Sequence, residues 1–312
     1  MPSPEQATTH PDRVISAALA RAITRRASGQ TYHTIRWLVD RGRSDDAFRA
    51  YAYFRWVDDT VDAPGHDRAA RLKLLRRQRQ LLSELLAGLA PAGLSPEEQI
   101  LADLLAARGD GHPGLRSYLE HMMAVMEFDV ARRGRLIRAI ELDRYSRLLA
   151  TAVMDAIAYF IGHDHAYPAT PARMQAVIGA HIVHMLRDTV DDLSTGYFNV
   201  PRDLLMLHRM TPSDVHHPAY RRWVRERVRL ARRCFIEGKA YLRTLGCLRA
   251  RLAGYLYCAR FEAVLRRIQL DGYRLRAGYD HLPPRPGWLE RFARQHLAMM
   301  RGPRRTPTGG AD

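Results

Sequence analysis

With 312 residues, 46% of them hydrophobic and 26% charged, the chain has the composition of an ordinary globular protein. Its formal net charge is +16, but the basic residues are spread along the chain, which disfavours a nucleic-acid groove and favours phosphorylated ligands or anionic membrane surfaces. The three cysteines form no CxxC pair, which argues against a disulfide framework. Because the start is polar and no apolar segment could span a bilayer, the sequence predicts a cytoplasmic protein with at most peripheral membrane contact.

Apolar residues recur every three or four positions in most of the chain, which is the spacing of α-helices that bury one face. The clearest such segments, in chain order, are residues 13–23, 69–89, 118–131, 144–162, 174–193 and 255–273. Strand-like alternation and internal repeats are absent from the sequence. These patterns predict one all-α domain, a helical bundle over residues 13–301, with disordered ends at 1–12 and 302–312.

The tetrapeptide DTVD occurs twice, first in RWVDDTVDAP (residues 55–64) and again in LRDTVDDLSTG (residues 186–196). Asp58 and Asp62 are four residues apart, as are Asp188 and Asp192, so each pair is expected on one face of a helix. Like charges at this spacing repel each other unless a cation lies between them. Two such clusters indicate an oxygen-rich Mg²⁺ site for a phosphorylated substrate rather than two solvated helix ends.

At these residues the chain resembles the squalene/phytoene synthase family. YAYFRWVDDTVD is similar to the first aspartate-rich motif of that family, and HMLRDTVDDLSTGYFNVPRDLL is similar to the second. ELDRYSRLLATAV is similar to its tyrosine-containing helix, and MEFDVA precedes that helix. The resemblance implies an all-α isoprenoid-synthase fold around a central cavity. It also implies ionisation of a prenyl diphosphate to an allylic cation with two or three Mg²⁺ ions.

The resemblance assigns roles to individual positions. Catalytic roles fall on Tyr51, Asp58, Asp62, Tyr145, Asp188 and Asp192. The four outer aspartates would hold Mg²⁺, and His184 is a further candidate metal ligand or acceptor contact. Diphosphate contacts would come from Arg55, Arg187, Thr31 and Tyr32.

Several positions depart from the family pattern, and they cluster where a second prenyl diphosphate would bind. Gly29 and Gln30 replace a hydroxyl and a basic residue, and Phe261 and Gly278 fall where a tyrosine and an arginine are usual. Polar amides before the second motif become His181 and His184. Thr151 and Met154 replace small residues that leave room for prenyl tails.

These departures favour a prenyltransferase that ionises one short prenyl diphosphate and passes the prenyl group to a small aromatic acceptor such as a carbazole or indole, as in secondary metabolism. The acceptor and prenyl pocket would be formed by Thr151, Met154, Asp155, His181 and Phe261. The alternatives are head-to-head condensation of two prenyl diphosphates, cyclisation of one, or a non-catalytic diphosphate-binding module. A di-iron bundle is disfavoured because it needs ExxH pairs on two helices, which the sequence lacks.

Overall fold

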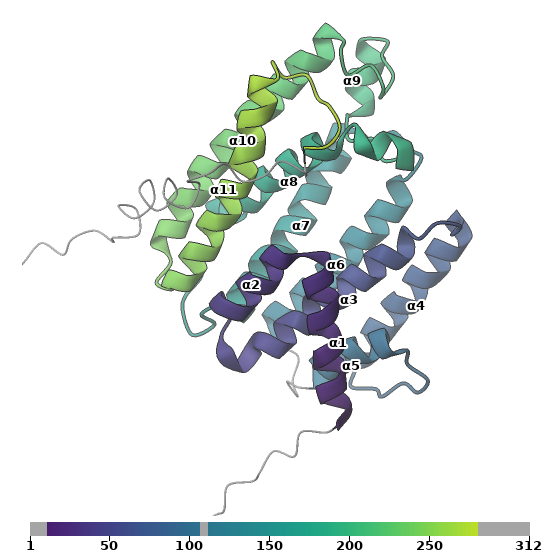
Figure 1. Cartoon of the computed structure of the whole chain (residues 1–312), viewed down its shortest axis with the longest axis vertical. Helices are drawn as coiled ribbons and strands as arrows, with labels where there is room; N and C mark the ends of the chain where they lie inside the picture. The colour runs from purple at the N-terminus through teal and green to yellow at the C-terminus, as the bar shows by residue number, and fades with distance from the viewer. Residues whose placement is uncertain (1–10, 107–111, 280–312) are drawn as a thin grey trace, which may run out of the picture. The chain divides into compact units, whose positions relative to one another are not determined.

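The computed structural model describes residues 11–106 and 112–279, and in this part of the chain every regular element is a helix (Figure 1). The all-α prediction is therefore confirmed. The predicted disordered ends lie outside the described residues, except that the first helix already begins at Pro11. In the described part of the chain, no helix has the length and apolar character needed to cross a membrane.

The packing of the chain defines two compact units. Unit 1 comprises residues 1–135 and 143–164, and unit 2 comprises residues 136–142 and 165–312. The chain passes from unit 1 to unit 2 after residue 135 and returns to unit 1 after residue 142. The first four residues of the long helix α7 (Ala139–Phe160) therefore belong to unit 2. A single domain over residues 13–301 stays a prediction.

Unit 1 contains six complete helices, a short 3₁₀ turn and most of α7. They are α1 (Pro11–Ala27), α2 (Gly29–Leu38), η1 (Arg41–Arg43), α3 (Ser44–Val61), α4 (Arg68–Leu86), α5 (Pro96–Ala106), α6 (Pro113–Arg132) and α7 (Ala139–Phe160).

The helix α3 forms the centre of unit 1, where it packs against α1, α2, α5 and α6. Its buried side chains include Phe54, Val57 and Val61, which recur at the spacing of one helical face. The remaining face carries the first aspartate cluster. Burial of the apolar face therefore fixes the orientation of the polar one.

Local sequence signals explain where several of these helices begin. Ser28 caps α2 by accepting a hydrogen bond from the Thr31 amide at 3.1 Å. Before α5, Ser95 and Glu98 form a reciprocal capping box, in which each side chain accepts from the other residue's amide. Glu98 also accepts bidentate hydrogen bonds from Arg77 on α4, at 2.6 and 2.7 Å, so the same residue ties two helices together.

Unit 2 contains three long helices and three short elements. They are η2 (Pro171–Met174), α8 (Gln175–Asp188), η3 (Asp191–Thr195), α9 (Arg202–Leu207), α10 (Pro218–Thr244) and α11 (Leu248–Leu270). In Figure 1, α10 and α11 run side by side, and both also contact α8.

Glycines allow the helices of unit 2 to approach one another closely. A Cβ atom on Gly238 of α10 would lie 2.4 Å from the backbone nitrogen of Ala176 in α8. A Cβ on Gly179 of α8 would lie 3.1 Å from the carbonyl oxygen of Ala231. Because backbone rather than a side-chain tip would be met, only glycine fits at Gly238.

One predicted element ends earlier than its sequence pattern. The apolar periodicity predicts a helix over residues 174–193, but α8 ends at Asp188 and a separate 3₁₀ turn begins at Asp191. Asp188 and Asp192 are therefore not one turn apart on a continuous α-helix, and that part of the prediction is wrong. The Thr189 hydroxyl bonds the Met185 carbonyl at 2.6 Å where the helix ends.

Candidate active site

The first aspartate cluster occupies one face of α3, as predicted. Tyr51, Arg55, Asp58 and Asp62 are spaced by four, three and four residues, which places them in one row. The helix ends at Val61, yet the amide of Asp62 still bonds the carbonyl of Asp58 at 3.0 Å, so the helical spacing persists. Arg55 forms an ion pair with Asp58 at 3.3 Å and donates a hydrogen bond to Asp59.

The surroundings of Asp58 disfavour its charged form. Burial raises its pKa to about 6, Arg55 counteracts this effect, and the negative charges of Asp62 and Asp129 act in the same direction as burial. A carboxylate held near other carboxylates with too little positive charge is the environment that a divalent cation would relieve.

Two neighbours of this cluster were not found by sequence reasoning. Arg133 donates to Asp62 at 3.1 Å. Asp129 accepts a 2.7 Å hydrogen bond from the Tyr145 hydroxyl and another of 2.7 Å from Arg132. The only sequence signal for Asp129 was its place in MEFDVA, which was read for its resemblance and not for its acid.

Tyr145 is held tightly in this arrangement. Its ring stacks on Phe128 with centroids 4.8 Å apart. Burial, together with the charge of Asp129, raises its pKa well above the ordinary value, so the phenol stays protonated and donates a hydrogen bond to Asp129.

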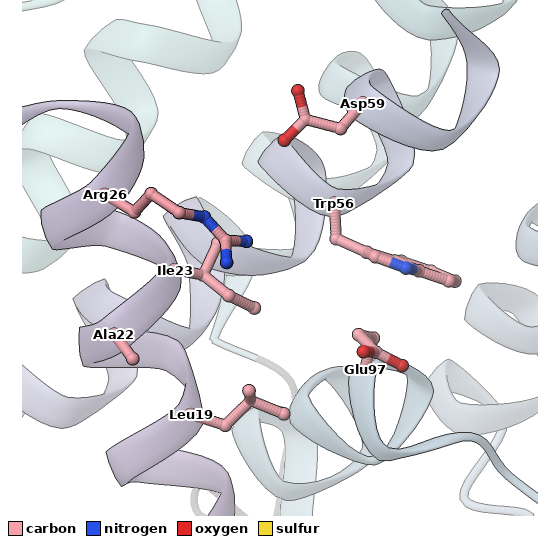
Figure 2. A pocket seen from close by; sticks show the side chains of 7 residues that line it. All are labelled: Leu19, Ala22, Ile23, Arg26, Trp56, Asp59 and Glu97. Carbon is pink, nitrogen blue, oxygen red and sulfur yellow. The ribbon is translucent and has the colours of Figure 1, made fainter. Parts of the chain in front are cut away.

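Asp59 is the middle acid of the first motif. It lines a pocket of about 260 Å³ between α1, α3 and α5, together with Arg26, Trp56 and Glu97 (Figure 2). Its carboxylate also accepts a hydrogen bond from Arg55, so Asp58 and Asp59 share one guanidinium.

The second cluster lies at the end of α8. Asp188 accepts from His184 Nε2 at 2.8 Å and from two nitrogens of Arg187 at 2.5 and 2.7 Å. Burial acts to raise its pKa, but the bonds from His184 and Arg187 outweigh burial and hold the pKa at about 2. His184 is therefore a partner of a candidate metal ligand in this structure.

The other acids of the second motif also have partners. Asp192 accepts from the side-chain amide of Asn199 at 2.7 Å. Asp191 accepts from the backbone amide of Gly278 at 3.1 Å. Gly278 thus contributes its backbone where the resemblance led us to expect an arginine side chain.

The candidate diphosphate contacts at the start of α2 are partly exposed. The Thr31 hydroxyl donates to Ser28 at 2.9 Å. The Tyr32 hydroxyl accepts from Arg25 at 3.2 Å, and the Arg25 guanidinium lies over the Tyr32 ring. Arg25 thus places a basic group near Gln30, which stands where the family usually has a basic residue.

The candidate pocket residues on α7 fall into different environments. Met154 is buried, with 2% of its surface exposed, while Thr151 bonds the Arg147 carbonyl within its own helix at 3.0 Å. Asp155 accepts a 2.6 Å hydrogen bond from Ser117 on α6. A partner on a neighbouring helix is thus present for Asp155.

The candidate pocket residues in unit 2 are both buried. His181 is buried in α8 and Phe261 in α11. Tyr257 lies one helical turn before Phe261, and the two rings meet edge to face at 5.1 Å. Burial raises the pKa of Tyr257, so it remains a neutral hydroxyl near the position where the resemblance predicts a tyrosine.

The donor chemistry of both clusters fits Mg²⁺. Within residues 11–106 and 112–279, no three His, Cys, Asp or Glu side chains are already gathered as a complete metal site. Paired carboxylates are the partial ligand set that Mg²⁺ completes with water and substrate phosphate oxygens. Asp58 with Asp62, and Asp188 with Asp192, would supply such pairs.

Comparisons with known proteins identify the family and the fold of the chain. A sequence model described as squalene/phytoene synthase matches residues 25–288. The chain is similar to squalene synthase HpnC from Alicyclobacillus acidocaldarius, with 20% identity and a TM-score of 0.67 over 86% of this chain and 98% of that one. It is also similar to a dehydrosqualene synthase solved in complex with a ligand, with 12% identity and a TM-score of 0.72 over 92% and 97% of the chains. No match was found among curated protein sequences.

The fold shared with these structures is the all-α fold of isoprenoid synthases. Within that class, the match over residues 25–288 shows that the chain belongs to the squalene/phytoene synthase family. Members of this family are prenyl-transferring enzymes that bind prenyl diphosphates and generally use a divalent metal. The comparisons support head-to-head condensation better than transfer to an aromatic acceptor.

Proposed function

We propose that this protein condenses two prenyl diphosphates head to head in a Mg²⁺-dependent reaction. The observation that carries the proposal is the family match over residues 25–288, which includes both aspartate motifs with all four outer aspartates retained. Transfer to an aromatic acceptor, which the departures from the family pattern favour, is not the activity named for either of the two structures described above.

Four of the departures, at Gly29, Gln30, Phe261 and Gly278, have a group of the missing chemical type within five residues. Beside Gln30, Arg25 supplies a guanidinium, and Ser28 and Thr31 supply hydroxyls in place of the one absent at Gly29. Tyr257 stands one turn from Phe261. Arg276 stands two residues before Gly278 and bonds Asp271 at 3.0 Å. These groups could replace the missing contacts at these four positions, which makes the four departures compatible with a second prenyl diphosphate.

The roles of the chain's own residues follow from their chemistry. Bound Mg²⁺ would supply positive charge that neutralises the diphosphate leaving group. Asp58, Asp62, Asp188 and Asp192 would hold these ions, and Arg55 and Arg187 would contact diphosphate oxygens after loosening their present carboxylate pairs. Tyr145, fixed by Asp129 and Phe128, would present an oriented phenol next to the first cluster.

The proposal is tested by incubating the protein with Mg²⁺ and farnesyl or geranylgeranyl diphosphate, with and without a panel of indoles, carbazoles and hydroxynaphthalenes. We expect a dimeric hydrocarbon, or its cyclopropyl diphosphate precursor, in the absence of any acceptor. EDTA, or Asp58→Ala, should abolish diphosphate release while the helical circular dichroism spectrum is retained. A prenylated aromatic compound as the sole product would restore the aromatic-acceptor hypothesis and remove this one.

A further inference from the structure

Unit 2 exposes three large apolar side chains on two neighbouring segments. Met206 and Leu207, at the end of α9, are 65% and 76% exposed, and Ile140, in the first turn of α7, is 64% exposed. Side chains of this size are normally withdrawn from water, and a group of them on a well-formed element indicates a surface that meets an apolar partner.

Hydrogen bonds hold these segments together. The Arg202 amide donates to the Ile137 carbonyl at 2.7 Å, and the Ala139 amide donates to the Asp203 carboxylate at 3.2 Å. Met206 and Leu207 follow Asp203 by three and four residues, so both lie on the same face of α9 as Asp203. Because Asp203 contacts Ala139, that face lies beside the segment that carries Ile140.

The other side of α9 is anchored in unit 2. Leu205 is buried, and so is Met210, whose amide bonds the Leu205 carbonyl at 2.8 Å just past the end of the helix. The intervening Arg209 takes a left-handed backbone conformation with φ of 53°. Met206 and Leu207 are therefore presented outward by an anchored turn.

Arginines surround the apolar group. Arg138, Arg202 and Arg209 are all exposed. The neighbouring acids are engaged locally: Asp203 accepts from Ala139, and Glu141 accepts from the Arg138 amide at 2.8 Å and lies 3.8 Å from its guanidinium. The three arginines outnumber these two acids by one, so the surface has a formal charge of +1, of the same sign as the net +16 of the whole chain.

We propose that this surface, the α9 patch (Ile140, Met206, Leu207, Arg138, Arg202 and Arg209), docks the protein on an anionic lipid bilayer. Apolar side chains surrounded by arginines match an interface in which acyl chains lie beneath negatively charged headgroups. A stable protein partner would need about 800 Å² on each side, which three apolar side chains do not provide. The bilayer needs no complementary shape, and its charge complements the three arginines.

The test is flotation of the full-length protein with vesicles of phosphatidylcholine alone, or of phosphatidylcholine mixed with phosphatidylglycerol. The wild type should bind the anionic vesicles and bind the neutral ones far more weakly. Met206→Ser with Leu207→Ser should weaken binding by at least about tenfold, because two apolar side chains no longer enter the membrane. Arg202→Gln with Arg209→Gln should weaken binding to anionic vesicles by about 25-fold, at about fivefold for each arginine.

Matched controls come from unit 1. Leu89 is an exposed leucine in the loop after α4, and Arg68 and Arg76 are exposed arginines of α4. Leu89→Ser, and Arg68→Gln with Arg76→Gln, should bind anionic vesicles within about twofold of the wild type. The proposal is overturned if the wild type does not float with the anionic vesicles. It is also overturned if the patch variants bind as tightly as the wild type, or if the control variants lose as much binding as the patch variants. All variants should keep the wild-type circular dichroism spectrum and enzymatic activity in solution.

Discussion

Asp58 and Asp188 occupy the first position of two similar motifs, yet their surroundings drive their pKa values in opposite directions. Burial and neighbouring acids raise the pKa of Asp58 to about 6. At Asp188, burial is outweighed by His184 and Arg187, which hold the pKa at about 2. In the absence of metal, the negative charge of Asp58 therefore destabilises the folded protein, whereas that of Asp188 stabilises it.

The sign of each effect follows from proton linkage. The folded protein binds a proton at Asp58 more tightly than the unfolded chain does, so stability falls as the pH rises through about 6. Without divalent metal, Asp58→Asn should therefore stabilise the protein above this pH, and the gain should shrink progressively as the pH falls from about 6 toward the unfolded value of about 4. The side chain is 43% exposed, so solvent screening limits the gain to about 0.3–1 kcal/mol.

Asp188→Asn should have the opposite effect on stability. Its folded pKa lies below the unfolded value, so the charge stabilises the protein at neutral pH, and its removal should cost about 1–2 kcal/mol. Thermal unfolding followed by circular dichroism between about pH 5 and 8 measures both variants. Shifts of the same sign in the two variants at neutral pH would contradict this assignment of the charges.

Tyr145 and Asp129 should act as one unit. Their hydrogen bond is 2.7 Å long and partly buried, and Arg132 orients the same carboxylate. Tyr145→Phe and Asp129→Asn should each lower kcat, and the double variant should be less impaired than the product of the two effects predicts. We expect a coupling energy of about 1–3 kcal/mol. Effects that multiply independently would show that Asp129 does not position Tyr145.

Met154 should limit the length of the prenyl chain. It is almost fully buried, and the resemblance places it where the family has a glycine. Met154→Gly should shift relative use toward longer prenyl diphosphates, because the vacated volume cannot be refilled easily. Competition between two chain lengths in one tube measures this ratio independently of any loss of folded protein. With Val153→Ala as control, an unchanged ratio for Met154→Gly would place Met154 in the ordinary core.

At the scale of the elements, the contact between α8 and α10 is the most demanding in unit 2. Gly238→Ala would bring a methyl group to 2.4 Å from the backbone of Ala176, and neither helix can yield locally. We expect a loss of about 1–3 kcal/mol or more in the free energy of unfolding. Gly29→Ala is the control, because a Cβ there meets nothing within 4 Å. Chemical denaturation compares the two, and equal stability would contradict the close approach of the helices.

Helix identity was predictable from the sequence to a greater extent than helix ends. Apolar periodicity located α4, α6, α7 and α11 because each buries one continuous face. The end of α8 was missed because the periodic pattern continues through Thr189 and Val190, whereas the chain turns there and begins η3. The apolar patterns do not predict α2, although Ser28 provides its cap.

For the site, residues that carry a motif could be predicted, and residues that support the motif could not. Asp58 and Asp188 were found by their spacing. Asp129, Arg133 and Tyr257 come from other segments, and only folding shows which acid, guanidinium or ring reaches which neighbour. This gap explains why the sequence alone favours an aromatic acceptor: substituted positions are visible in a sequence, but the groups that could replace them are not.

At the scale of the whole molecule, the central claim is that two prenyl diphosphates are joined to each other. The most direct measurement mixes unlabelled and fully deuterated farnesyl diphosphate with enzyme and Mg²⁺ and determines the mass of the product. Head-to-head condensation predicts unlabelled, half-labelled and fully labelled products, with the half-labelled species most abundant. Products containing label from a single substrate molecule only, as cyclisation or transfer to an aromatic acceptor would give, would contradict the account.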